Sequence, residues 1–391
     1  MAFTILEVKS SAFVREFLNL PVDLYRNDSN WIRPLNKDIE DIFDPEKNKH
    51  FRNGEATRWI LQDEMGKTVG RVAAFIDRKT SNTHAQPTGG MGFFECIDNQ
   101  EAANTLFDTC KQWLQARGME AMDGPINFGE RDRWWGLLSE GFYEPNYCMG
   151  YHHKYYQKLF ENFGFKVFFK QLTYHMPVTD KNVDPVVWEK ASRIEQNPDY
   201  RVVNINRKEL AKFADDFVTI YNKAWGRFAG VGAMSKAQAH ALLKSIKPII
   251  DERLMLFAYH LDEPIGFLIM LPELNQVVKH LNGKFNWYAK LKMMYLLKVK
   301  KVCTKALGLI FGIVPQHQGK GIEGALVNGF ARWATRDDYP YTEIELNWIG
   351  DFNPSMCKVA EQIGAKVRKV HITYRYMFDP NKVVAPYRRV N

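Results

Sequence analysis

Residues 309–334 read LIFGIVPQHQGKGIEGALVNGFARWA. An apolar run typical of a buried strand leads into a turn rich in glycine and lysine, and an amphipathic helical pattern follows. The start of a helix carries unpaired N–H groups and about half a positive charge, so it attracts anions. Glycines at 319 and 321 permit the positive φ angles that turn those N–H groups toward a phosphate. The stretch predicts a strand, a phosphate-binding turn and a helix; the alternative is a plain strand-to-helix connection.

The same order of patterns occurs twice in the chain. Residues 90–114 align with 309–334, so that Leu106 matches Leu326 and Trp113 matches Trp333. Several such matches in the same order indicate two copies of one α/β unit, 1–178 and 179–391. The other matched pairs are the hairpin patterns 59–75 and 256–271, the strands around Asn127 and Asn347, and the segments ENFGFKV (161–167) and EQIGAKV (361–367). The first copy holds an insertion, GERDRWWGLLSEGFYEPNYC, at 129–148.

Composition supports two domains and a cytoplasmic location. A chain of 391 residues with 46% hydrophobic content is long enough for two cores. Its five cysteines have no CxxC or Cys/His spacing, which predicts reduced thiols and no metal site. The first residues lack a signal-peptide pattern, and no apolar run approaches the ~18 residues of a transmembrane helix. We therefore expect a soluble, cytoplasmic protein without a transmembrane segment.

Charge is concentrated in one segment. The net charge is +8, yet no acidic residue occurs between Glu273 and Glu323. The lysines of this segment are Lys279, Lys284, Lys290, Lys292, Lys298, Lys300, Lys301, Lys305 and Lys320. Because the rest of the chain is close to neutral, DNA is not an expected partner. An anionic ligand near Lys320 would explain the segment; a solvated lysine-rich helix face is the alternative.

The order of elements resembles that of the GNAT acyltransferase superfamily. The family's Gln/Arg-x-x-Gly-x-Gly/Ala turn holds the pyrophosphate of coenzyme A, and here Gln318-Gly-Lys-Gly321-Ile-Glu323 falls in that register, with Glu323 in place of the last Gly/Ala. The resemblance covers nearly the whole chain as two copies and implies a mixed α/β sheet in each. It implies acetyl-CoA or another acyl-CoA as cosubstrate and no metal. The implied coenzyme-binding residues are Ile313, Val314, Gln318, Gly319, Lys320, Gly321, Ile322, Glu323, Gly324 and Asn353.

The first copy lacks this turn. Its corresponding residues, 98–103, read DNQEAA, with no glycine and with two carboxylates that would repel a pyrophosphate. The first copy is therefore expected to keep the fold without binding coenzyme A there.

The strand TEIELNW at 342–348 supplies the candidate catalytic groups. Alternation along a strand puts Glu343, Glu345 and Asn347 on one face. In the family an amine attacks the thioester carbonyl directly where this strand and the preceding one diverge, so Glu345 is the candidate base, Asn347 the candidate acceptor-positioning group and Glu343 a candidate substrate contact. The alternative is that this face is solvated or paired with Lys and Arg side chains of the other domain.

The family's frequent acid, a tyrosine in the last helix, is replaced here by Ala360. Tyr374 is the candidate substitute, although Tyr174 occupies the same place in the first copy and a packing role is the alternative. Asn353 is equally a candidate helix cap.

The acceptor site is expected between the two copies. Its candidate walls are Tyr221 and Trp225, the loop 225–234 and the aromatic-rich insertion 129–148. The alternative for the insertion is an aromatic-rich plug between the domains. The segment 283–307 interleaves lysine with apolar residues at helical spacing and predicts a core-facing helix, an acyl-channel wall or a helix resting on a membrane surface.

Taken together, the sequence predicts an acyl-CoA-dependent N-acyltransferase, with acetyl as the expected acyl group and a small-molecule or peptide amine as acceptor. The alternatives are an acyl-CoA-binding protein without turnover, or a transferase that uses long-chain acyl-CoA or aminoacyl-tRNA.

Overall fold

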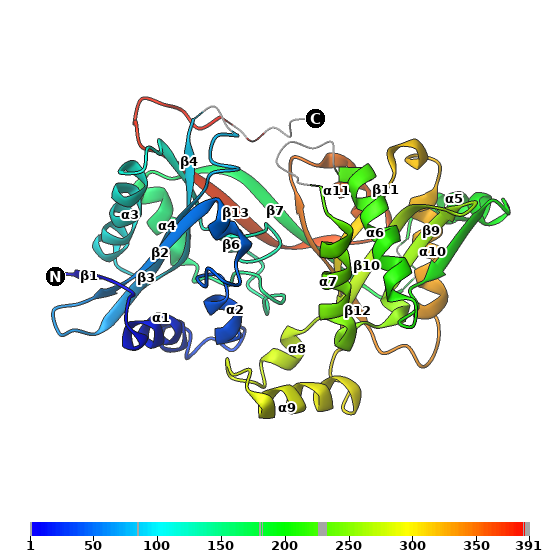
Figure 1. Cartoon of the computed structure of the whole chain (residues 1–391), viewed down its shortest axis with the longest axis horizontal. Coiled ribbons are helices and arrows are strands. Elements are labelled where there is room, and N and C mark those ends of the chain that lie inside the picture. The colour runs from blue at the N-terminus through cyan, green and yellow to red at the C-terminus, as the bar shows by residue number, and fades with distance from the viewer. Residues whose placement is uncertain are drawn as a thin grey trace.

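The chain forms two α/β lobes joined through one continuous sheet, with β7 and β13 crossing between them (Figure 1). The computed structural model describes residues 2–83, 86–179, 181, 183–225, 233–385 and 387. In the first half the strands are β1 (Thr4–Glu7), β2 (Gly54–Gln62), β3 (Thr68–Asp77), β4 (Thr88–Cys96), β5 (Ala121–Gly124), β6 (Leu137–Glu140) and β7 (Lys166–Pro177). The helices of that half are α1 (Ser11–Leu24), α2 (Asn36–Glu40), η1 (Lys49–Arg52), α3 (Gln100–Gln115) and α4 (Tyr155–Phe163).

The second half repeats this order with additions. Its strands are β8 (Tyr200–Asn204), β9 (Met255–His260), β10 (Glu263–Pro272), β11 (Lys305–Ile313), β12 (Glu343–Gly350) and β13 (Lys366–Met377). Its helices are α5 (Pro185–Glu195), α6 (Leu210–Trp225), α7 (Lys236–Ile246), η2 (Lys247–Ile249), η3 (Glu252–Leu254), α8 (Asn275–Val278), α9 (Trp287–Lys298), η4 (Pro315–His317), α10 (Ile322–Ala334) and α11 (Pro354–Gln362). The predicted hairpins, strand-turn-helix units and two-copy order are confirmed.

Helices cover both faces of each half of the sheet because neighbouring strand residues point to opposite sides. In β2, Leu61 joins the core that contains Leu106 of α3, whereas Ile60 packs against Phe17 of α1. The second half does the same: Leu256 of β9 joins the core of α10, and Phe257 joins that of α6.

The last strands of the two halves are exchanged, which the sequence did not predict. The strand order is β1-β2-β3-β4-β5-β13-β7-β12-β11-β10-β9-β8. Thus β13 of the second half pairs with β5 of the first, and β7 of the first half pairs with β12 of the second. Arg375 of β13 donates two hydrogen bonds to the Asp123 carboxylate of β5, at 2.6 and 2.7 Å. The boundary near residue 178 remains a prediction, but neither half builds its own sheet alone.

Candidate functional site

The glycine-lysine turn lies between β11 and α10, as the sequence predicted. Gly319 has a φ of 73° and Gly321 a φ of 102°, in the left-handed region that glycine adopts readily. The Gln318 side chain donates to the carbonyl of Ile313 at 2.9 Å and ties the turn to the end of the strand. A Cβ at Gly319 would meet no heavy atom within 4 Å, so this side of the turn is open.

The N-terminus of α10 has no side-chain cap. Its N-cap residue is Gly321, whose lack of a side chain leaves the first N–H groups of the helix without an internal acceptor. The equivalent helix of the first half differs: Asn99 caps α3 by accepting a hydrogen bond from the N–H of Ala102 at 2.9 Å. Of these two matched helix starts, therefore, one is closed by its own side chain, whereas the other has no side-chain cap and packs at Gly321 against Lys190 of α5.

Removing the first-half cap is expected to affect stability and not coenzyme binding. Asn99→Ala should lower the free energy of unfolding by about 1 kcal/mol, because the N–H of Ala102 loses its acceptor. Chemical denaturation measures this loss, and calorimetry with coenzyme A on the same variant should give the wild-type affinity. A large loss of affinity would instead place an anion site at α3.

The turn and the neighbouring helix α5 each supply a lysine near Glu323. Glu323, in the first turn of α10, lies 3.7 Å from the Lys190 ammonium of α5, measured between Oε1 and Nζ. Lys320 is exposed in the turn itself. Two lysines thus offset one carboxylate where a pyrophosphate would sit, so the departure from the family pattern at Glu323 leaves the site net positive.

Several of the predicted coenzyme contacts have buried side chains. Ile313, Val314 and Ile322 belong to the apolar cores, so only their backbone groups can reach a ligand. A Cβ at Gly324 would come within 2.6 Å of the Val187 carbonyl of α5, which assigns this glycine to helix packing. Asn353 is the N-cap residue of α11, but its side chain makes no capping hydrogen bond.

The strands β11 and β12 diverge before β11 reaches this turn. Their parallel pairing runs from Lys305 opposite Glu343 to Gly308 opposite Leu346 and ends there. Asn347 is the first β12 residue beyond the last pair, and its amide oxygen is buried without a hydrogen-bond donor among the described residues. An unpaired buried acceptor is costly, and a substrate N–H would satisfy it.

Tyr221 and Trp225 of α6 lie over the same end of β11. The Trp225 indole covers Gly312, where a Cβ would come within 2.3 Å of its ring, and stacks with Phe267 at a ring-centroid distance of 5.7 Å. Tyr221 packs beside Trp225. Residues 226–232 of the predicted acceptor loop lie outside the described residues.

Glu345 lies in a buried ion cluster, not in an open cleft. Its carboxylate is fully buried and accepts hydrogen bonds from Lys369 at 2.6 Å and from Lys305 at 3.0 Å. Burial alone would raise its pKa, but the two ammonium groups outweigh burial and lower the pKa to about 2. A carboxylate with this pKa is a poor proton acceptor near neutral pH.

Glu343 is paired as well. Its carboxylate contacts His175 at 2.8 Å and accepts a hydrogen bond from Arg368 at 3.1 Å. Pairing with basic side chains therefore describes Glu343 and Glu345 better than substrate contact does, although the Lys and Arg partners belong to the same half and not to the other domain. The amide oxygen of Asn347 is left without a partner among the described residues.

Tyr374 lies away from the turn because of the strand exchange. It belongs to the first-half core, where it packs against Phe160 and its hydroxyl donates to Glu161 at 3.1 Å. The tyrosine that enters the second-half core is Tyr174, from β7. The structure thus corrects the placement of Tyr374 beside the thioester and supports the packing alternative.

The insertion of the first half reaches the second-half strands. The Trp348 indole of β12 donates to the carbonyl of Arg131 at 2.9 Å. Burial raises the pKa of Tyr221, and the carboxylate of Glu130, the residue before Arg131, raises it further. The insertion therefore contacts β12 of the second half, and its part in an acceptor site stays a prediction.

His50 and Asp77 were missed by the sequence reasoning. His50 Nδ1 lies 2.7 Å from Asp77 Oδ2, and its Nε2 lies 3.6 Å from Glu130 Oε1. These two carboxylates raise the pKa of His50 to about 9, so the imidazole is protonated at neutral pH. No spacing signal could have found this cluster, because its members come from η1, the end of β3 and the insertion.

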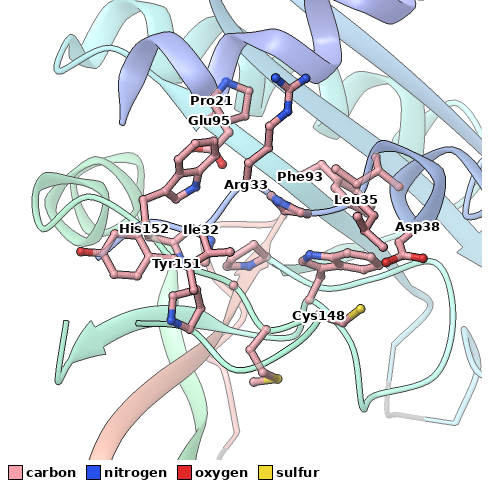
Figure 2. Close-up of a pocket in the computed structure, with 18 of the residues that line it drawn as sticks. Pro21, Ile32, Arg33, Leu35, Asp38, Phe93, Glu95, Cys148, Tyr151 and His152 are labelled. Atoms are coloured by element: carbon pink, nitrogen blue, oxygen red, sulfur yellow. The ribbon is translucent and has the colours of Figure 1, made fainter. Parts of the chain in front are cut away.

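A cavity lies mainly within the first half, between α1, the segment before α2 and the insertion (Figure 2). It contains a buried pair, Arg71 and Glu95, and the Glu95 carboxylate accepts hydrogen bonds from the hydroxyls of Tyr25 and Tyr156, each at 2.8 Å. Its volume of about 60 Å³ is far below the ~300–1,000 Å³ of typical ligand pockets, so it has no room for an acyl-CoA. It is therefore a polar core region.

Among the described residues, no group of three or more His, Cys, Asp or Glu side chains is arranged to hold a metal ion. No helix among those residues has the length and apolar character that crossing a bilayer requires.

Known proteins resemble the chain over most of its length. No family model matches it. It is 28% identical to the bacterial ceramide synthase of Caulobacter vibrioides over 380 residues, 95% of this chain and 96% of that protein. It is 26% identical to protein YghO of Escherichia coli over 371 residues, 92% of each.

Solved structures of other proteins share the fold described above. A tandem GNAT protein from the clavulanic acid biosynthesis pathway superposes with a TM-score of 0.57 at 10% identity, covering 97% of this chain and all of that one. A GCN5-related glucosamine N-acetyltransferase region of a fungal multi-domain protein gives a TM-score of 0.56 at 12% identity, with 96% of this chain covered and 38% of that chain. The chain is therefore a tandem GNAT-fold protein.

Proposed function

We propose that the chain is an acyl-CoA-dependent N-acyltransferase whose second half holds the coenzyme. The observation that carries this proposal is the uncapped N-terminus of α10 beside Gly319 and Gly321, in contrast to the capped α3. Backbone N–H groups of this turn would hold the pyrophosphate, with Lys320 and Lys190 as nearby cations. The coenzyme would supply an acyl group activated as a thioester.

The reaction follows from the divergence of β11 and β12. An uncharged amine nitrogen attacks the thioester carbonyl, a C–N bond forms, and the C–S bond breaks to release a thiolate. The nitrogen loses one proton, which the thiolate takes up to give the thiol. The buried amide oxygen of Asn347 would accept a hydrogen bond from an N–H of the incoming amine and so orient the lone pair of the amine nitrogen. Neither Glu345 nor Tyr374 takes part in this scheme, since both are engaged elsewhere.

We propose a long-chain acyl donor and a long-chain amino-alcohol acceptor. The support is the similarity to a bacterial ceramide synthase over 95% of the chain, since a ceramide is the amide of a fatty acid and a long-chain amino alcohol. This proposal replaces acetyl, the acyl group expected from the sequence, with the long-chain alternative.

Thiol release tests the proposal. Acetyl-CoA and palmitoyl-CoA should each be combined with a long-chain amino alcohol, a short polar amine and a peptide amine. Release is expected for palmitoyl-CoA with the amino alcohol, and mass spectrometry should find the amide. Preferred acetylation of the short amine would contradict the chain-length proposal, whereas coenzyme binding with no release for any pair would favour a binding protein without turnover.

A further inference from the structure

The helix α9 is apolar on both of its faces. Its inner face packs against other parts of the protein: Ala289 and Met293 contact the cluster formed by Ile32 and Leu35 of the first half and Val278 of α8. Leu296 and Leu297 pack against the second-half core. One apolar face is enough to seat a surface helix, and a helix that is apolar all round is normally buried on all sides.

The outer face of α9 is exposed nevertheless. Trp287 is 73% exposed, Leu291 60% and Val299 67%, and Tyr288, Met294 and Tyr295 lie exposed between them. With a rotation of about 100° per residue, these positions form one stripe along the helix. Figure 1 shows α9 at the lower edge of the molecule, with α8 between it and the sheet. Contiguous exposed apolar surface of this kind marks an interaction site.

Lysines surround this stripe, which we call the α9 face and define by Trp287, Tyr288, Leu291, Met294, Tyr295 and Val299. Lys290 and Lys292 flank it on opposite sides of the helix. Lys284 precedes the helix, and Lys298, Lys300 and Lys301 stand at its end. Since no acidic residue occurs between Glu273 and Glu323, nothing in this segment neutralises them. A partner of the α9 face must therefore offer both an apolar region for the stripe and negative charges for the lysines.

The coenzyme turn is not that partner. The lysines beside α9, residues 284–301, precede β11, whereas the turn with Lys320 follows it, and nine extended residues separate the two ends by about 30 Å. The phosphate of a coenzyme bound at Gly319 and Gly321 therefore has other cations for neighbours, and these lysines remain to be explained.

We propose that the α9 face lies on the surface of an anionic lipid bilayer. Aromatic and aliphatic side chains would enter the boundary between headgroups and acyl chains, and the flanking lysines would contact lipid phosphates, as in interfacial amphipathic helices. Twelve helical residues extend about 18 Å, so α9 rests on the bilayer and does not cross its ~30 Å apolar core.

A second copy of the chain fits the α9 face less well. A symmetric contact would bring the lysines of one copy against the identical lysines of the other, with no carboxylate of this segment between them. Nucleic acid would neutralise the lysines but leave Leu291 and Val299 in water. The bilayer satisfies both the charge and the apolar area.

Flotation of the full-length protein with vesicles tests the proposal. Binding is expected with phosphatidylcholine vesicles that contain phosphatidylglycerol and not with phosphatidylcholine alone, and it should weaken with added salt. Leu291→Ser combined with Met294→Ser should weaken binding about tenfold, because two exposed side chains no longer enter the lipid. Each of Lys298→Gln and Lys300→Gln should weaken it about fivefold.

Two further variants test whether binding depends on the α9 face itself. Leu242 is also an exposed leucine, 43% accessible on α7, so Leu242→Ser should leave vesicle binding unchanged. Trp287→Phe should still bind, but the quenching of tryptophan fluorescence by lipids with brominated chains should fall, since Trp287 would be the indole closest to the lipid.

The outcomes separate the possible occupants and are independent of the proposed reaction. Equal binding to neutral vesicles, or no binding to anionic ones, overturns the proposal. A concentration-dependent dimer that Leu291→Ser dissociates would assign the face to a second copy, and binding to duplex DNA in preference to vesicles would assign it to nucleic acid. None of these measurements uses substrate, while thiol release with detergent-dispersed substrates needs no vesicle, so either proposal can fail alone.

Discussion

Gly319→Asp is expected to weaken coenzyme A binding at least about tenfold, or about 1.4 kcal/mol, and to reduce acyl transfer in proportion. Residue 319 is open, with no heavy atom within 4 Å of its ideal Cβ position, so the aspartate would displace nothing in the protein. Its carboxylate would instead lie where the pyrophosphate is proposed to bind. Two such charges about 5 Å apart repel by ~3 kcal/mol at an effective dielectric constant of 20, and solvent at this exposed turn reduces that value.

The matched control is Gly319→Asn, which has nearly the same shape without the charge. Gly319 has a φ of 73°, and asparagine and aspartate both tolerate that region, so the backbone effects of the two variants should cancel in the comparison. Isothermal titration calorimetry with coenzyme A measures both affinities. If the aspartate and asparagine variants bind equally well, the phosphate does not lie at this turn and the coenzyme assignment is wrong.

Local sequence patterns predicted the turn well because its chemistry lies in contiguous residues. The glycines at 319 and 321, and the helix start after them, all lie within one contiguous segment. The contrast with the first half was also local, since residues 98–103 contain no glycine and two carboxylates; the Asn99 cap of α3 was added by the structure. What was not visible is that Gly324 serves the packing of α5, which comes from a distant part of the chain.

The strand exchange could not be predicted from the duplication. Matched copies such as Tyr174 and Tyr374 have the same pattern and therefore fit either core equally well. Repeats in a sequence establish which strands exist, but partner choice depends on tertiary contacts such as that between Arg375 and Asp123. The error about Tyr374 follows from this, because the prediction placed it with its own half.

The partners of Glu345 were hidden for the same reason. Alternation correctly grouped it with Glu343 as a polar residue of a central strand. Lys305 was counted among the charges of the basic segment, yet it is buried opposite β12, and Lys369 arrives on β13. A periodic pattern identifies a buried carboxylate but not the cation that neutralises it, and that cation decides between a base and a structural ion pair.

Glu345→Gln is therefore expected to destabilise the protein by about 3–5 kcal/mol, the cost of leaving a buried cation without its partner. Glutamine preserves the volume, so no cavity contributes, and Lys369 would remain buried beside a neutral amide. Glu343→Gln on the same strand is the matched control; its carboxylate is partly exposed and screened by solvent, so its loss should be about 1 kcal/mol or less. Chemical denaturation measures both changes.

The pH dependence and a double variant distinguish this role from catalysis. Because the folded-state pKa of Glu345, about 2, lies below the usual value of 4.5, its contribution is complete above the unfolded-state pKa and is lost as the pH falls toward 2. Between these pH values Glu345→Gln should show a shallower loss of stability than the wild type. Adding Lys369→Met should recover part of the loss, since it removes the unpaired buried charge. A Glu345→Gln variant with wild-type stability and no acyl transfer would instead make Glu345 the base.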